Sequence, residues 1–119
     1  MRYYGNVCYR RSIRDQPSAR PLHAMMIDDY VVDTLMADLI GHDRQPSAFI
    51  VYLFLARAVQ DGRASTVQIA LQDVAERTGL SKRSVQSALG WLVKRKLIAV
   101  ARESITAIPV YTVMRPWRR

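Results

Sequence analysis

The side chains best suited to bind a charged or polar partner in this 119-residue sequence lie together between positions 81 and 87. Lys82 and Arg83 carry positive charges on long side chains, and Gln86 carries an amide that both donates and accepts hydrogen bonds. Cationic donors of this kind bind anionic groups, and an amide can form two hydrogen bonds with a flat polar partner. The segment therefore predicts recognition of a partner by charge and hydrogen bonding.

A helix is the element that places these three side chains on one surface. Val85 and Leu89 are apolar and four positions apart, so they share the inward face of a helix expected over residues 81–96. The three polar side chains then point outward beside the small residues Ser87 and Gly90. The major groove of DNA, about 12 Å wide, admits a helix with long donors, an amide and little bulk. Gly90 costs roughly 1 kcal/mol relative to alanine, and it allows either a DNA backbone or a neighbouring element to approach closely.

The residues before this helix predict a second helix that crosses it. Leu71–Thr78 has helical spacing, and Ala75 is small enough to let another helix pass closely. Gly79 can adopt the positive φ that ends a helix and reverses the chain. Ser81 can then cap the helix that follows. The pair is therefore expected to be two helices joined by a tight turn.

The remaining apolar and turn-forming residues predict a mainly helical chain with a small β-hairpin, which is the α+β class. The expected order is helix, helix, strand, helix, helix, strand and strand, over residues 28–40, 46 to about 62, 66–69, 71–78, 81–96, 98–102 and 107–114. Gly41 is expected to stop the first helix. Pro109 has no N–H to donate, so the last strand is expected at a sheet edge or paired on one side there.

The chain divides into three parts by composition. Residues 1–27 are basic and lack periodicity, so they are expected to form an arm with no core of its own. Residues 28–43 hold five Asp and no Lys or Arg, and their apolar positions form one stripe of a helix. That stripe is expected either to pack on the chain's own core or to form a dimer helix, with neither favoured. Residues 44–119 hold the other elements as one domain.

Charge and cysteine content exclude several classes of protein. The net charge is +8, and residues 81–119 hold nine basic residues and one acidic residue. Such a concentration of positive charge attracts polyanions through the release of counterions. Cys8 is the only cysteine, which excludes an internal disulfide and a cysteine zinc site and favours a reducing, cytoplasmic compartment. No apolar run reaches the length of a membrane span, so a membrane protein is not expected.

The segment from Leu71 to Leu89 resembles the helix-turn-helix of winged-helix DNA-binding proteins, a group that includes GntR-type and MarR-type regulators and plasmid or phage replication initiators. The resemblance extends over residues 46–114. It implies a three-helix core and a β-hairpin wing, to which this chain adds an N-terminal helix. Ala70 and Lys96 depart from the pattern, because the family often has a Ser or Thr cap at the first position and a Gly at the second. Lys96 is expected to let the recognition helix run slightly longer.

By position, the resemblance implies that the recognition helix 81–96 enters the major groove and that Arg102 lies near the tip of the wing. Lys94 and Arg95 are expected to add phosphate contacts. Arg83 and Gln86 are expected to contact base edges, which suit guanine and adenine respectively. The full set of expected DNA contacts is Ser81, Lys82, Arg83, Ser84, Gln86, Ser87, Lys94, Arg95 and Arg102.

The expected function is sequence-specific binding of double-stranded DNA by a homodimeric transcriptional regulator. Two alternatives stay open, a replication initiator and a winged helix that binds another protein. No catalytic residue, metal, cofactor or small-molecule substrate is expected. The sequence holds no nucleophile with a matching base, no Gly-rich phosphate loop and no metal-ligand spacing, so an enzyme is not expected.

Overall fold

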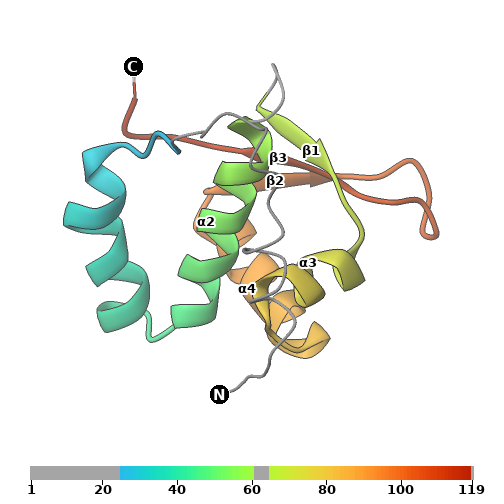
Figure 1. The fold of residues 1–119 in the computed structure, drawn as a ribbon, viewed down its shortest axis with the longest axis horizontal. Coiled ribbons are helices and arrows are strands. Elements are labelled where there is room, and N and C mark those ends of the chain that lie inside the picture. The colour runs from blue at the N-terminus through green and yellow to red at the C-terminus, as the bar shows by residue number, and fades with distance from the viewer. Residues whose placement is uncertain (1–24, 61–64, 119) are drawn as a thin grey trace, which may run out of the picture.

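The computed structural model describes residues 25–60 and 65–118 (Figure 1). Its elements are η1 (Val31–Leu35), η2 (Ala37–His42), α2 (Pro46–Gln60), β1 (Thr66–Gln68), α3 (Leu71–Thr78), α4 (Lys82–Lys94), β2 (Ile98–Ala101) and β3 (Val110–Val113). The predicted order of helices and strands is confirmed, as is the α+β class. Most of the predicted arm, residues 1–24, lies outside the described residues.

Helix α2 occupies the middle of the fold. Figure 1 shows it between the two N-terminal helical elements and the sheet with α3 and α4. Pro46 fits its first turn because no backbone N–H is required there. Seven residues around the helix are buried: Ala48, Phe49, Val51, Tyr52, Leu55, Ala56 and Val59. The helix is therefore buried on more than one side.

The acidic N-terminal segment winds as a π-helix, in which backbone N–H groups bond five residues back. Val31, Leu35 and Leu39 recur every four residues, and all three are buried in the core. Of the two roles left open by the sequence, the structure shows this row of the stripe packed on the chain's own core. A second row of the stripe remains outside, since Val32 is 51% exposed and Ile40 is 39% exposed.

The prediction that Gly41 stops this helix is wrong. The helical segment continues through Gly41 to His42. The chain leaves the helix at Arg44, whose φ of 57° is left-handed, and Gln45 N then donates to Leu39 O at 2.7 Å. The helical segment therefore ends two residues later than the position of Gly41 predicts, in a turn closed by a backbone hydrogen bond.

Helices α3 and α4 are joined by the predicted tight turn. Gly79 has a φ of 80°, and its N–H donates to Ala75 O at 2.9 Å. Ser81 Oγ accepts a hydrogen bond of 3.1 Å from Ser84 N, which satisfies one of the unpaired donors at the start of α4. Ala70 supplies no side-chain cap for α3, because a methyl group cannot accept a hydrogen bond.

The end of α4 corrects the prediction made for Lys96. The helix ends at Lys94 and does not run further, because Lys96 itself adopts a left-handed φ of 61°. Lys96 N donates to Val93 O at 3.0 Å, and Leu97 N donates to Leu92 O at 2.9 Å. These two bonds form the Schellman arrangement that usually places glycine at this position. Leu97, the residue that follows this helix end, is buried in the core.

The three strands form one antiparallel sheet in the order β1-β3-β2. Tyr111 of β3 pairs with Val67 on one side and with Val100 on the other. The prediction that the last strand lies at a sheet edge is therefore wrong, whereas the alternative, pairing on one side at Pro109, agrees with the single backbone hydrogen bond found there among the described residues. Pro109 causes no conflict, because it precedes β3 and offers only its carbonyl, which accepts from Ile69 N at 3.3 Å.

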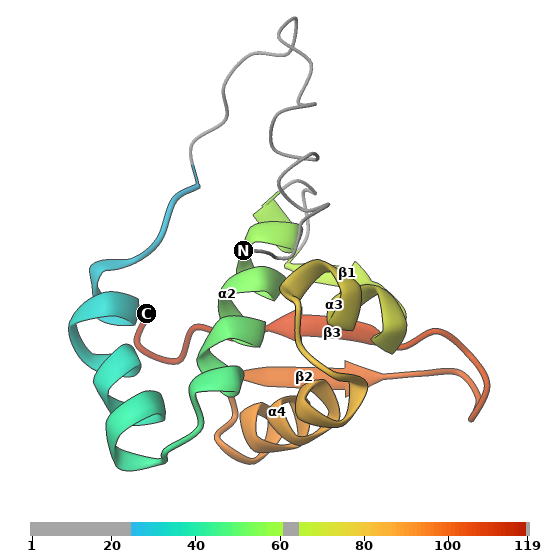
Figure 2. The same cartoon turned by 60° about the horizontal axis from the view of Figure 1, so that its bottom comes forward.

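The β2–β3 hairpin has shorter strands and a longer loop than predicted. Its loop comprises residues 102–109, in place of the four residues 103–106 between the predicted strands 98–102 and 107–114. Figure 2 shows the loop extending away from the helices. Arg102 opens the loop, and Ile105 within it is 90% exposed.

Candidate nucleic-acid interface

Helix α4 presents one polar face to solvent. Its inward residues are Val85, Ala88, Leu89 and Leu92, which are all buried. The outward residues Lys82, Arg83, Gln86 and Ser87 are all exposed. The spacing of apolar residues thus has the consequence expected from sequence, and four of the nine candidate contacts lie together on one surface.

The charge on this face is not neutralised within the described chain. Neither the Lys82 nor the Arg83 side chain forms an ion pair or hydrogen bond with any residue in 25–60 or 65–118. Helix α4 also contains no Asp or Glu. Both cations lie in its first turn, where the partial positive charge of the helix disfavours them. An anion bound there would remove this unfavourable interaction.

Ser81 and Ser84 have a structural role at the same end of α4. Besides the cap described above, Ser81 Oγ donates to Ser84 Oγ at 3.0 Å. Ser81 is exposed and Ser84 is half-buried. Their hydroxyl groups therefore hold the helix start and place Lys82 and Arg83 at its tip.

A groove of about 250 Å³ separates α4 from the β2–β3 hairpin. Gln86 and Gly90 line the helix side, and Arg102 lines the hairpin side. The other lining residues are apolar or aromatic: Leu71, Leu89, Val93, Val100 and Tyr111. No acidic residue lines it. The guanidinium of Arg102 also donates to Ile105 O at 3.4 Å, which holds it beside the hairpin loop.

The two candidate contacts at the far end of α4 have other neighbours. Arg95 Nη2 lies 2.9 Å from Asp38 Oδ2, and Arg95 Nε lies 3.5 Å from Asp43 Oδ2. The charge of Arg95 is thus balanced by the acidic N-terminal helix. Lys94 Nζ lies 5.1 Å from the centroid of the Trp91 ring, within cation–π range. The structure does not bring Lys94 and Arg95 into the cluster at the start of α4.

A buried carboxylate links the acidic helix to α4. The side chain of Asp43 is only 4% exposed. It accepts a hydrogen bond of 2.8 Å from Trp91 Nε1, and its other oxygen lies 2.9 Å from His42 Nδ1. Hydrogen bonding to His42 and then to Trp91 lowers the pKa of Asp43, although burial opposes this. His42 and Asp43 are neighbours in the chain, whereas the hydrogen bond from Trp91 to Asp43 carries no signal in the sequence.

A second carboxylate anchors the C-terminal segment. Asp28 accepts hydrogen bonds from Trp117 Nε1 at 2.7 Å and from Arg118 Nε and Nη2 at 2.6 Å each. Hydrogen bonding to Arg118, followed by that to Trp117, lowers the pKa of Asp28 to about 2. Trp117 also stacks on Tyr30, with ring centroids 4.7 Å apart. Trp117 therefore fixes the C-terminal segment to the start of the N-terminal helical segment.

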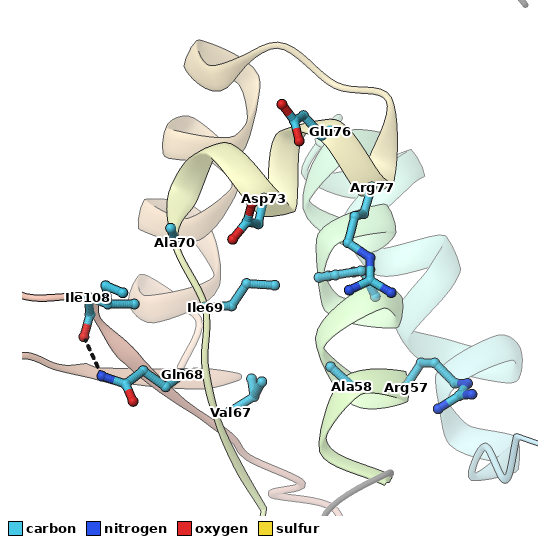
Figure 3. A pocket seen from close by; sticks show the side chains of 11 residues that line it. Arg57, Ala58, Val67, Gln68, Ile69, Ala70, Asp73, Glu76, Arg77 and Ile108 are labelled. Atoms are coloured by element: carbon cyan, nitrogen blue, oxygen red, sulfur yellow. Dashed lines mark hydrogen bonds between the residues drawn. The ribbon is translucent and has the colours of Figure 1, made fainter. Parts of the chain in front are cut away.

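A larger cleft of about 710 Å³ lies between α2 on one side and β1 with α3 on the other (Figure 3). Arg57, Arg77, Asp73 and Glu76 all line it, so its charged groups are balanced in sign. Arg77 also lies 5.7 Å above the ring of Phe54. Figure 3 shows the hydrogen bond of 3.3 Å from the Gln68 amide to Ile108 O across the end of the cleft. This cleft lacks the single-sign charge of the α4 face.

Within residues 25–60 and 65–118, no three His, Cys, Asp or Glu side chains are grouped closely enough to hold a metal ion. No helix in the same part of the chain combines the length and apolar character required to cross a membrane.

No protein-family model, curated protein or solved structure matches this chain.

Proposed function

We propose that this chain is a winged-helix protein that binds double-stranded DNA in a sequence-specific manner through α4. The observation that carries the proposal is the exposed face of α4, on which Lys82, Arg83 and Gln86 lie together without a partner in the described chain. A helix that enters the major groove requires this combination of cationic and amide donors. The β2–β3 hairpin then corresponds to the wing.

The exposed residues divide into two kinds of contact. Lys82, Lys94 and Arg102 supply positive charge for phosphate groups, which position a protein on DNA but carry no sequence information. Arg83 and Gln86 supply the donors for base edges, which suit guanine and adenine respectively. Arg95 is left out of this set, because Asp38 and Asp43 already pair with it.

The proposal includes a homodimer that acts as a transcriptional regulator. Val32 and Ile40 are exposed apolar residues on the N-terminal helical segment, eight positions apart, with half-buried Met36 between them. A second copy placed against this row would cover it. Dimeric helix-turn-helix proteins bind two half-sites separated by about 34 Å, one turn of DNA. A dimer of this chain would therefore prefer a palindromic site.

One observation favours the alternative, a winged helix that binds a protein. Ile105 is 90% exposed and Ile108 is 50% exposed in the hairpin loop, and Val100 on β2 is 40% exposed. Exposed apolar side chains at one end of a molecule are typical of protein interfaces. In this alternative the hairpin, and not α4, contacts the partner.

Selection of bound duplexes from a random pool, followed by gel-shift titration at physiological salt, tests the proposal. Enrichment of one sequence and tighter binding to it than to random duplex support DNA recognition. Arg83→Ala is expected to weaken binding to the selected site by about 1–3 kcal/mol and to relax the preference at one base pair. No enrichment and no retardation at any salt concentration would exclude DNA binding and favour the protein-binding alternative.

The genomic position of the selected sequence separates a regulator from a replication initiator. Sites upstream of transcribed genes support the regulator. Clustered copies of the site at an origin of replication support the initiator and exclude the regulator.

A further inference from the structure

Gly90 occupies an unusual position in α4. It lies seven residues after Arg83 and four after Gln86, so the three residues share one face of the helix. Glycine is the least favourable ordinary residue for the interior of a helix, apart from proline. A glycine at such a position is explained when another element of the fold must approach it closely.

The fold itself does not require this glycine. A Cβ built on Gly90 meets no heavy atom within 4 Å in the described chain, and its φ is not in the left-handed region. The space over Gly90 belongs to the groove between α4 and the hairpin. Of the two explanations expected from sequence, close approach of a neighbouring element is therefore excluded for the described residues.

The groove around Gly90 has the chemistry of a nucleic-acid backbone site. Arg102 faces it from the hairpin wall and can donate hydrogen bonds to phosphate oxygens, while Gln86 faces it from the α4 wall. Val93 and Val100 are 43% and 40% exposed and provide an apolar surface against which deoxyribose can pack. No carboxylate lines the groove to repel a phosphate.

We propose that the sugar-phosphate backbone of one DNA strand lies in the groove between α4 and the β2–β3 hairpin, in direct contact with Gly90. This inference rests on the proposed DNA binding and adds the path of the strand. Gly90 is a positioning residue, since any side chain there would hold the DNA backbone away from α4 and from Arg102. Its absence of a side chain thus contributes to affinity for DNA and not to stability of the fold.

The test compares Gly90→Ala with Gly41→Ala. Gly41 is the matched control, because it is also an exposed glycine within a helical segment and also has nothing within 4 Å of a built Cβ. Both variants should raise the midpoint of thermal unfolding by about 4 °C, because both remove a helical glycine. Only Gly90→Ala should weaken binding to the selected duplex, by about tenfold, since an extra methyl in a close contact typically costs over 1 kcal/mol.

Each outcome has a defined meaning. If the wild-type chain binds no duplex, the proposed function fails. If the wild-type chain binds and Gly90→Ala binds equally well, the path of the strand is wrong while DNA binding stands. Gly90→Leu, with a larger side chain, should weaken binding further. If Gly90→Leu instead changes the sedimentation mass of the DNA-free protein, the groove is an interface between copies and the inference is overturned.

Discussion

Trp91 Nε1 and Asp43 Oδ2 lie 2.8 Å apart, although 48 positions separate the two residues in the chain. Trp91 belongs to α4, and Asp43 ends the acidic N-terminal helical segment. The same carboxylate lies 3.5 Å from Arg95 Nε. The N-terminal segment is therefore fixed to the helix that carries the candidate DNA contacts.

Asp43→Ala should lower the free energy of unfolding by about 1–3 kcal/mol, because it leaves Trp91 Nε1 and Arg95 without their buried acceptor. Urea denaturation measures the change. Asp33→Ala is the control, since it removes the same charge from an exposed position on the same segment. Equal losses in the two variants would show that net charge, and not the buried contact, is responsible.

The lowered pKa of Asp28 predicts that the free energy of unfolding depends on pH in the acid range. This pKa is about 2 in the folded chain, against 3.8 for an ordinary Asp, because Arg118 and Trp117 donate hydrogen bonds to the ionised form. A lowered folded pKa contributes stability that is fully present above the unfolded value and is lost as pH falls through the folded value. The free energy that separates wild type from Asp28→Asn should therefore shrink between pH 3.8 and pH 2.

Denaturant titrations at several pH values measure this difference. Asp29→Asn is the control, since Asp29 is an exposed neighbour whose side chain forms no hydrogen bond with the described residues. A difference between wild type and Asp28→Asn that stays constant over the whole range would contradict the role given to the Arg118 contact.

Lys96→Gly should stabilise the fold by about 1 kcal/mol, because Lys96 adopts a left-handed φ that costs an L-residue more than glycine. The comparison is Gln86→Gly, at an exposed position inside α4, which should destabilise by up to about 1 kcal/mol. Thermal unfolding gives both values. Two glycine substitutions of the same sign would contradict the conformation assigned to Lys96.

Lys82→Ala and Gln86→Ala should separate phosphate contacts from base contacts. Loss of one phosphate contact at Lys82 weakens selected and random duplexes alike and reduces the slope of log affinity against log salt by about 0.9. Loss of an amide contact at Gln86 weakens only the selected duplex and leaves the slope unchanged. Titrations at four salt concentrations on both duplexes give the two quantities. An unchanged slope for Lys82→Ala would remove that residue from the phosphate contacts.

Local rules predicted most of the fold and the polar face. The spacing of Val85 and Leu89 fixes which side of α4 is buried, so the exposure of Arg83 and Gln86 follows from four or five neighbouring residues. The cap at Ser81 and the turn at Gly79 depend on equally local properties of the backbone.

The contacts that sequence reasoning missed join distant positions. Asp28 and Arg118 are 90 residues apart, and no periodicity marks them as partners. No periodicity marks Arg95 and Asp38 as partners either. The sequence therefore predicts that Arg95 faces DNA, whereas in the fold it pairs with Asp38. Pro109 led to the wrong edge position for another reason. The rule that proline lies at sheet edges rests on its missing N–H, while this sheet uses only its carbonyl. Such pairings depend on the packing of whole elements.

The central place of β3 in the sheet bears on how the protein is made. Both β1 and β2 precede β3 in the chain, yet neither pairs with the other. During synthesis the ribosome must therefore complete Val110–Val113 before any ladder can close. Until then the nascent polypeptide exposes two unpaired strand edges, which are open to association with other chains.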